Sequence, residues 1–192
     1  MTKEQGKVIV IVAPSGTGKS TLISRIKKCF PEIRESISFT TRARRPAEID
    51  GEHYHFITES EFKQKIQAEE FLEWAMVHGD YKGTSKDFVK SQIQTGSSIL
   101  FDLDVQGADA IKNYFGNLAQ VIFICPPSFE ELEKRLRERK TESEEKIKIR
   151  LANAKRELAR KEDYDYLVIN DEIEKAFLDL KNTVGKIIGT GR

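Results

Sequence analysis

The feature that most constrains this chain is a buried-strand pattern that runs directly into a glycine-rich turn and then into a helical pattern. Residues 7–13 (KVIVIVA) form a short β-branched run, as expected of a strand buried on both faces. Residues 13–21 (APSGTGKST) follow, and a helical pattern extends from Lys19 to about Cys29. Glycines in such a turn let consecutive backbone N–H groups point at phosphate oxygens, and the helix adds its unpaired donors. This context predicts a loop that binds the phosphate groups of a nucleotide.

The loop matches the P-loop pattern, with one departure at its first position. The usual pattern begins with glycine, and Ala13 stands there instead, which costs little if its backbone angles are ordinary. Lys19 is expected to reach the β- and γ-phosphates, and the Ser20 hydroxyl is placed to ligate Mg²⁺. A purely structural turn is the alternative, which the strand–turn–helix context disfavours. The residues expected to bind the donor nucleotide are Ala13, Pro14, Ser15, Gly16, Thr17, Gly18, Lys19, Ser20 and Thr21.

Further buried-strand patterns alternate with helical patterns along the chain. Residues 98–104, 120–125 and 166–170 are each typical of a buried strand. Buried strands separated by helices indicate a parallel sheet with helices on both faces. The expected fold class is therefore α/β, with three α/β/α layers around a central parallel sheet.

Two stretches interrupt this alternation and predict insertions. Residues 37–84 hold shorter, more polar strand-like pieces around one helix, expected from Ser60 to about Glu69, and indicate a small mixed α/β unit. Residues 128–162 are helical and rich in charge, and suggest two helices joined near residues 140–143; a solvated surface hairpin is the alternative. The expected core domain consists of residues 1–36, 85–127 and 163–192.

Composition excludes several classes of partner. The chain has 32 Lys and Arg against 31 Asp and Glu, a formal net charge of +1, which gives no sign of a nucleic-acid or membrane partner. Cys29 and Cys125 are the only cysteines, and their wide separation suggests a reducing compartment and no metal cluster. The N-terminal apolar run, residues 8–13, is too short for a signal peptide or a membrane span, so we expect a cytoplasmic protein.

Three arginines gather in a short polar loop that follows the first helix. Arg42, Arg44 and Arg45 lie within four positions, and their planar guanidinium groups suit phosphate oxygens. They would repel one another unless an anion or a carboxylate lay nearby. Glu48 can hold one of them in place, and Tyr54 offers a hydroxyl to the same anion. By itself the segment is also compatible with a solvated basic turn.

Together with later motifs, this loop resembles the guanylate kinase family over roughly residues 7–188. In that family a segment S-x-T-T-R-x-x-R-x-x-E followed by a tyrosine builds the GMP phosphate site. The resemblance implies that residues 37–84 form a GMP-binding domain and residues 128–162 a helical lid on the P-loop core. The matching motifs are residues 38–48 with Tyr54, FLEWA at 71–75, GDYKGTS at 79–85, FDLDVQG at 101–107 and YLVIND at 166–171.

The resemblance assigns guanine recognition to Glu73, and the chemistry of the base fits a carboxylate. Guanine presents N1–H and its 2-amino group as donors, whereas adenine has no donor at that edge. Asp104 is expected as a second acceptor for the amino group, and the hydroxyls of Ser38 and Thr84 are expected to donate to O6. Polar groups that the wrong base leaves unpaired can discriminate by factors on the order of 10⁴.

Lys82 is the main departure from the family pattern, which usually has tyrosine there to meet the GMP phosphate. A lysine could make the same contact as a point charge or could point to solvent, and we expect the phosphate contact. Asp80 in place of the usual asparagine is a smaller change. The residues that the resemblance assigns to GMP are Ser38, Arg42, Arg45, Glu48, Tyr54, Glu73, Lys82, Gly83, Thr84, Asp102, Asp104 and Gly107.

Asp102 ends a buried strand at the position of a Walker-B carboxylate. It is expected to hold Mg²⁺ through a water molecule and to pair with Ser20. Phosphoryl transfer needs positioning and charge neutralisation more than covalent chemistry, and the GMP phosphate is itself the nucleophile. Lys19 is therefore expected to act catalytically without a strong general base beside it.

Arginines complete the expected catalytic set. In the family, lid arginines close over ATP and neutralise the transferring group, and by position these are Arg139 and Arg150, with Arg135 behind them. Arg42 is expected to bridge both phosphates from the GMP side. Asn170 ends the last strand, where the family meets the adenine ring.

The resemblance implies an enzyme that transfers the γ-phosphate of ATP to GMP, and to dGMP as well, with Mg²⁺, in purine nucleotide metabolism. We expect a monomer or a homodimer. One alternative is an inactive guanylate-kinase-like domain that binds peptides, but such domains lose the P-loop lysine and the lid arginines, whereas Lys19, Arg139 and Arg150 are present. Another is a kinase of the same fold with a different phosphate acceptor, for which Lys82 leaves room. A P-loop GTPase would need an N-K-x-D motif, which the sequence lacks.

Overall fold

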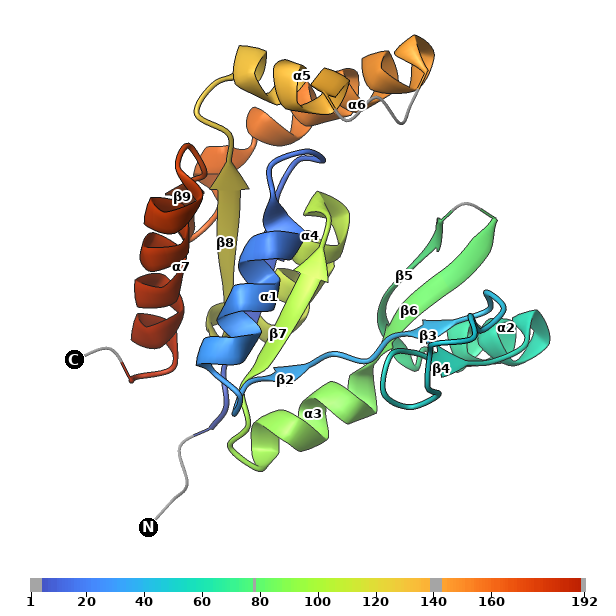
Figure 1. Ribbon diagram of the computed structural model, residues 1–192. Coiled ribbons are helices and arrows are strands. Elements are labelled where there is room, and N and C mark those ends of the chain that lie inside the picture. Colours follow the sequence, from blue (N-terminus) through green and yellow to red (C-terminus); the bar gives the residue numbers. More distant parts are fainter. Residues whose placement is uncertain (1–4, 78, 139–142, 191–192) are drawn as a thin grey trace.

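The computed structural model describes residues 5–77, 79–138 and 143–190. The chain folds into three parts, which Figure 1 shows together. A parallel sheet with helices on both faces forms the core, a smaller sheet with one helix lies to one side, and a pair of helices lies over the end of the core sheet. No helix among the described residues is long and apolar enough to cross a bilayer.

The central sheet has the parallel strand order β2-β7-β1-β8-β9 within the described chain. Strand β1 lies in the middle and pairs with both β7 and β8, and all of its residues are buried. The four strands expected from the sequence are confirmed with ends shifted by at most one residue, and the two-residue β2 was not expected. The bounds are β1 Val8–Val12, β2 Arg34–Glu35, β7 Ile99–Leu103, β8 Ala119–Cys125 and β9 Tyr166–Ile169.

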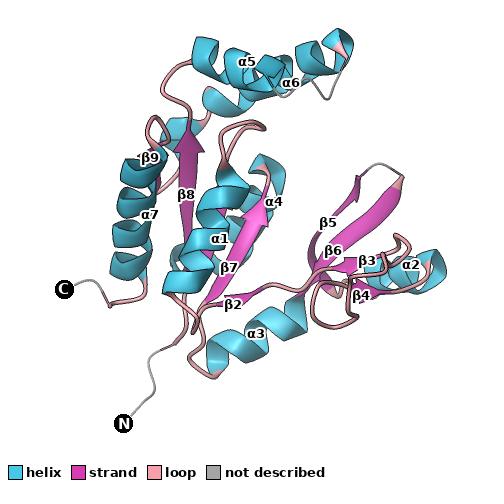
Figure 2. Ribbon diagram, in the orientation of Figure 1, coloured by secondary structure: helices cyan, strands magenta, loops and turns pink. Residues whose placement is uncertain are grey.

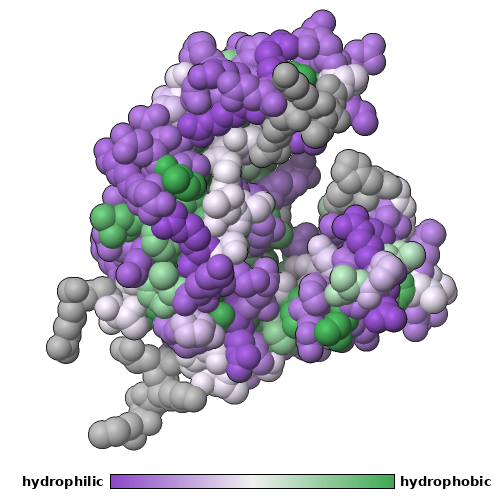
Figure 3. Space-filling model, viewed as in Figure 1, coloured by the Kyte–Doolittle hydropathy of each residue, from purple (hydrophilic) through white to green (hydrophobic). Residues whose placement is uncertain are grey.

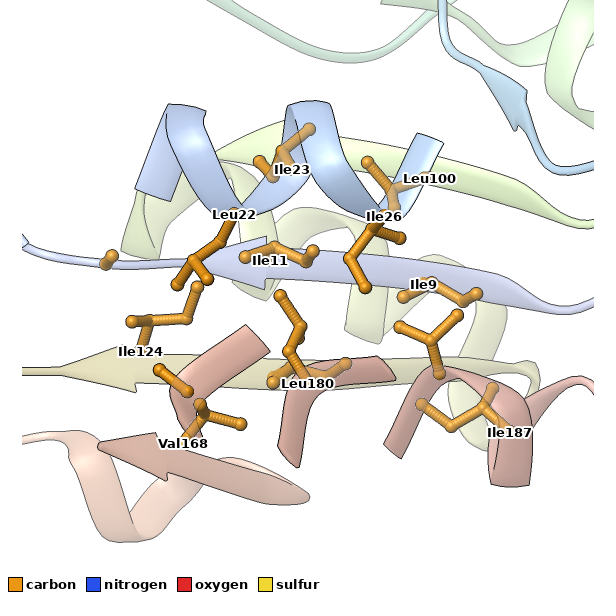
Figure 4. Packing of buried hydrophobic residues seen from close by; sticks show 14 of the residues in the cluster. Ile9, Ile11, Leu22, Ile23, Ile26, Leu100, Ile124, Val168, Leu180 and Ile187 are labelled. Atoms are coloured by element: carbon orange, nitrogen blue, oxygen red, sulfur yellow. The ribbon is translucent and has the colours of Figure 1, made fainter. Parts of the chain in front are cut away.

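Alternate residues of β1 face two separate apolar layers, as the pleat of a strand requires. Ile9 and Ile11 pack with helices α1 (Lys19–Cys29) and α7 (Ile173–Ile187), and Figure 4 shows these side chains meeting over the strand. Val8 and Val10 face the opposite layer, formed by α3 (Lys86–Gln94) and α4 (Val105–Phe115). Figure 2 shows the resulting sheet between helices, which confirms the α/β/α class.

A second sheet, in the order β4-β3-β6-β5, forms the unit that the sequence places at residues 37–84. Phe62 of α2 is fully buried and stacks on Phe71 and Tyr81, with ring centroids 4.5 and 5.2 Å away, so an aromatic cluster holds the helix on the sheet. Thr58 and Glu61 form a reciprocal capping box at the start of α2. The bounds are β3 Phe39–Thr40, β4 His55–Phe56, α2 Glu59–Gln67, β5 Phe71–Val77 and β6 Asp80–Ser85.

Two helices, α5 (Phe129–Glu138) and α6 (Glu144–Leu158), confirm the helical pair expected within residues 128–162. Leu132 and Leu136 of α5 and Ala154 of α6 are buried together, while most of the outer surface of the pair is hydrophilic (Figure 3). Short 3₁₀ turns, η1 (Gly116–Leu118) and η2 (Lys161–Asp163), precede β8 and β9.

Leu180→Ala should lower the free energy of unfolding by about 2–5 kcal/mol, because Leu180 is fully buried between α7 and β1 and its truncation leaves a cavity. Leu178 lies on the same helix with 55% of its surface exposed, so Leu178→Ala should change stability by less than about 0.5 kcal/mol. Urea denaturation measures both. Equal losses would contradict the described orientation of α7.

Candidate active site

The phosphate loop lies between β1 and α1 and is built from residues with special backbone conformations. Gly16 and Gly18 have φ of +97° and +85°, values that suit glycine, and Gly18 occupies the N-cap of α1 without a side-chain cap. In the first turn of α1, the Thr21 N–H donates to the Gly18 carbonyl oxygen at 3.1 Å, whereas the N–H groups of Lys19 and Ser20 are left for an external acceptor. Ala13 is not among the residues with positive φ, so alanine is tolerated at this first position. The Thr17 hydroxyl donates to the Pro14 carbonyl oxygen at 2.8 Å and closes the loop.

Lys19 and the end of strand β7 meet at the floor of the phosphate loop. The Lys19 ammonium lies 2.7 Å from Asp102 Oδ1 and donates to the Leu103 carbonyl oxygen at 2.9 Å. The sequence suggested that Asp102 pairs with Ser20, whereas the described contact of its carboxylate is with Lys19. The reason is topological, since β7 is parallel to β1 and ends beside the loop where the ammonium points.

The side-chain oxygen atoms below the phosphate loop suit Mg²⁺ only if phosphate groups and water supply the other ligands of the ion. The described residues contain no group of three or more His, Cys, Asp or Glu side chains that could hold a metal ion by themselves. Mg²⁺ usually keeps several waters and takes one or two protein oxygens together with substrate phosphates. The Ser20 hydroxyl on the first turn of α1 and the Asp102 carboxylate are oxygen donors of that kind.

The helical pair touches the phosphate loop directly. Arg150 Nη1 of α6 donates to Ser15 Oγ at 2.6 Å. A Cβ on Gly16 would lie 2.9 Å from Leu136 Cδ2 and 3.1 Å from Leu132 Cδ1, so α5 packs on the loop where glycine leaves room. Arg139 lies outside the described residues.

Arg135 lies on the other side of the loop, beside the end of β9. It donates to the carbonyl oxygens of Asn170 at 2.9 Å and Asp171 at 3.4 Å, and to Glu131 Oε1 at 3.0 Å. The buried Asn170 amide donates to the Thr17 carbonyl oxygen at 2.6 Å. A pocket here is lined by Gly16, Thr17, Gly18, Arg135, Glu138 and Asn170.

A second cleft, of about 560 Å³, lies between the smaller sheet and the core, where the space-filling view is hollowed (Figure 3). Residues from four distant segments line this cleft. An adjoining cleft is also lined by Ser38, Tyr54 and Asp102, and it includes Thr84. The expected acceptor residues that line the 560 Å³ cleft are Ser38, Tyr54, Glu73, Lys82, Asp102, Asp104 and Gly107.

The half-buried Glu73 of β5 and the buried Thr84 of β6 form a polar pair in this region. Thr84 Oγ1 donates to Glu73 Oε1 at 2.7 Å, and Thr84 is 1% exposed. Burial raises the pKa of Glu73, the Thr84 hydrogen bond opposes this rise, and the nearby Asp104 charge adds to it. The sequence assigned the Thr84 hydroxyl to a base oxygen, but in this structure it serves the carboxylate, because paired strands place the two residues opposite each other.

Two further expected residues have structural contacts as well. A Cβ on Gly83 would lie 3.0 Å from Phe62 and 3.1 Å from the Glu73 carbonyl oxygen, so glycine lets the smaller sheet close on α2. The Gly107 N–H donates to Asp104 Oδ1 at 2.8 Å, and Asp104 thereby caps helix α4.

Glu48 organises the arginine loop, as the sequence suggested. Arg42 Nη2 donates to Glu48 Oε1 at 2.6 Å, and the Arg45 backbone N–H donates to Glu48 Oε2 at 2.8 Å. The Arg42 hydrogen bond, followed by the Arg45 backbone bond, lowers the pKa of Glu48 to about 2. The Tyr54 ring centroid lies 5.5 Å from the Arg42 guanidinium carbon and 5.3 Å from Lys82 Nζ. Tyr54 and Lys82, which line the cleft, thus lie close to each other, and the Arg42 guanidinium, which is not among the lining residues, lies beside the Tyr54 ring.

Glu157 of α6 is a site residue that sequence motifs did not indicate. It lines the pocket above the phosphate loop together with Asp104 and residues 13–21. Its position in a charge-rich helix gives no local signal, because only the packing of α6 distinguishes it from its exposed neighbours.

Comparisons with known proteins agree on one family. A family model described as "Guanylate kinase" matches residues 5–187. A guanylate kinase from Chromobacterium violaceum is 44% identical over 184 residues, covering 96% of this chain and 87% of the relative. One from Thermotoga maritima is 43% identical over 172 residues, covering 90% and 83%. The crystal structure of guanylate kinase from Anaplasma phagocytophilum superimposes with a TM-score of 0.70 at 30% identity, covering 96% of this chain and 87% of that one.

Gly16→Ala should lower the free energy of unfolding by about 2–3 kcal/mol, because the new Cβ adds a clash with α5 to the strain of a positive φ. Gly79 has φ of +91°, and nothing lies within 4 Å of the place that a Cβ would take, so Gly79→Ala should cost only the strain, about 1 kcal/mol. Urea denaturation of both variants separates the two effects. A Gly16 variant no worse than the Gly79 variant would show that α5 does not press on the loop.

Proposed function

Since the chain belongs to the guanylate kinase family, it is an enzyme that transfers a phosphoryl group from ATP to GMP, and we propose that its two clefts divide this reaction between donor and acceptor. The observation that carries the assignment of the acceptor cleft is the hydrogen-bonded pair of the half-buried Glu73 and the buried Thr84. A half-desolvated carboxylate at a cleft is costly unless a ligand with two adjacent donors meets it. The N1–H and 2-amino groups of guanine are such donors.

The base of GMP is proposed to lie between Glu73 and Asp104. Asp104 uses Oδ1 to cap α4, and its other oxygen makes no hydrogen bond within the described residues, so it can accept from the 2-amino group. With Thr84 bonded to Glu73, Ser38 supplies the hydroxyl for O6, and Thr84 fixes the carboxylate for the base. Adenine would turn its N1 lone pair toward Glu73, which explains selection against AMP.

The phosphate of GMP is proposed to lie where Arg42, Arg45, Tyr54 and Lys82 converge. Glu48 holds the Arg42 guanidinium in a fixed orientation, and this reduces the entropy lost when the phosphate binds. Lys82 adds a point charge to a place where a phenol would only donate a hydrogen bond. Gly107 lines the same cleft, and Gly83 follows Lys82 on β6.

The donor is proposed to bind on the phosphate loop, with its adenine near Asn170 and Arg135. Residues 13–21 supply inward N–H groups, and Lys19 exchanges its Asp102 contact for β- and γ-phosphate oxygens. Arg150, already at the loop, and Arg139 are proposed to meet the transferring group. Residues 37–84 would then be the GMP-binding domain, 128–162 the lid, and the remainder the core.

In the transfer step, a phosphate oxygen of GMP attacks the γ-phosphorus of ATP in line, and the bond to the β–γ bridging oxygen breaks to give GDP and ADP. Lys19, Arg42 and Arg150 stabilise the charge on the moving group from three sides. Mg²⁺, when bound near Ser20 and Asp102, neutralises phosphate charge. Closure of the lid would exclude water and limit ATP hydrolysis.

We propose that the enzyme also accepts dGMP and functions in purine nucleotide metabolism in the cytoplasm.

ATP-dependent ADP production with GMP, dGMP, AMP, CMP, UMP and dTMP, with and without Mg²⁺, tests this function. We expect Mg²⁺-dependent activity with GMP and dGMP alone. Glu73→Gln should reduce kcat/KM for GMP by about 10²–10⁴, because the amide turns an N–H donor toward the donors of guanine. The exposed Glu69, just before β5, supplies the control Glu69→Gln, which should leave kcat/KM unchanged. An active Glu73→Gln enzyme would place guanine elsewhere.

Lys82→Met should raise KM for GMP roughly tenfold with little change in kcat, because one phosphate contact is lost from the ground and transition states alike. Lys82→Tyr should recover much of the loss, since the phenol donates to the same oxygen. Lys63→Met, which removes an exposed lysine of α2, is the matched control. Unchanged steady-state kinetics in Lys82→Met would mean that Lys82 points to solvent.

A further inference from the structure

The side chain of Glu157 is an unused carboxylate in the donor pocket. It belongs to α6, lines the pocket of about 380 Å³ above the phosphate loop, and is half-buried there. In the part of the chain that the structure describes, its carboxylate makes no hydrogen bond or ion pair. Three other glutamates of the helical pair do have partners: Glu131 pairs with Arg135, and both Glu133 and Glu144 pair with Arg137. A half-buried carboxylate that lines a pocket without a protein partner is left to water or to a ligand that enters the pocket.

The charges around Glu157 define what that ligand must be. Burial raises the pKa of Glu157, the charge of Asp104 raises it further, and Lys19 lowers it, so both groups lie close enough to act on it. The Lys19 ammonium is already paired with Asp102. A polyphosphate that entered without a cation would meet the carboxylates of Asp104 and Glu157 in this pocket, and their repulsion would oppose the attraction of the loop cations, Lys19 and Arg150.

Glu157 and Arg150 are presented to the loop by one helix. They are seven residues apart, two turns of α6, and so lie on the same face. Arg150 already donates to Ser15 of the loop, and Glu157 lines the pocket over the same loop. One helix face thus carries a cation suited to phosphate oxygens and, two turns away, an anion suited to a cation that accompanies them.

We propose that Glu157 is a positioning residue that makes the donor site select a nucleotide accompanied by a divalent cation. The carboxylate opposes bare phosphate groups and is stabilised when a cation and its water ligands lie beside them. The inference rests on the proposed function in one respect, that the phosphate loop binds the polyphosphate of the donor.

Calorimetric titration of the full-length protein with ADP tests the proposal without turnover, once in MgCl₂ and once in EDTA. For Glu157→Gln we expect tighter binding of ADP in EDTA and equal or weaker binding in MgCl₂. The ratio of the two dissociation constants, the value in EDTA divided by the value in MgCl₂, should fall roughly tenfold compared with the unmodified protein. Glu145→Gln, which neutralises an exposed glutamate on the same helix, should leave the ratio unchanged.

Other outcomes discriminate between explanations. Equal weakening in both solutions would mean that Glu157 only supports packing or the orientation of Lys19, and would overturn the proposal. Glu157→Asp keeps the charge and should keep most of the ratio, so it tests the same claim if the glutamine variant fails to fold; a ratio that fell as far in Glu157→Asp would also overturn it. Absence of ADP binding to the unmodified protein in either solution would instead refute the proposed donor site.

Discussion

Strand β1 is the element on which the rest of this structure depends. It is hydrogen-bonded along both edges and buried on both faces, so neither its position nor its direction can change without disrupting two apolar layers. The chain leaves this strand at Ala13 and enters α1 at Lys19, and the phosphate loop is the short connection between two immobile elements. Burial of β1 thus fixes the direction of the loop N–H groups, and preorganised donors of this kind stabilise phosphate charge with little reorganisation.

The phosphate loop is also held from outside the strand. The Asn170 amide binds its Thr17 carbonyl oxygen, Lys19 binds the end of β7, and the leucines of α5 rest against Gly16. These contacts come from three segments that are far apart in the sequence. The helical pair is therefore packed on the loop in this structure, even though most of its surface is charged and exposed.

The acceptor cleft differs from the phosphate loop in what holds its functional groups in place. In the cleft, polar side chains are oriented by hydrogen bonds to neighbouring polar groups. Glu48 orients Arg42, Thr84 orients Glu73, and Asp104 is fixed by its cap on α4. Each of these three side chains, Arg42, Glu73 and Asp104, thus has a partner that limits its rotation, which lowers the entropy cost of binding a ligand. Glu157 has no such partner among the described residues, and this difference separates it from the other carboxylates of the site.

The class of fold, the phosphate loop and the family could all be predicted from the amino-acid sequence. Those conclusions depend on local patterns. An apolar run indicates a buried strand, and glycines before a lysine, between such a strand and a helix, indicate a phosphate loop. The order of the motifs also assigned Glu73, Asp104 and the arginine loop to one substrate. Which side chains are partners became clear from the three-dimensional structure alone. Asp102 contacts Lys19, Thr84 donates to Glu73, and Glu157 lines the donor pocket, whereas its neighbours on α6 do not. The physical reason is that hydrogen bonds and desolvation depend on distances between segments remote in sequence, which no local pattern encodes.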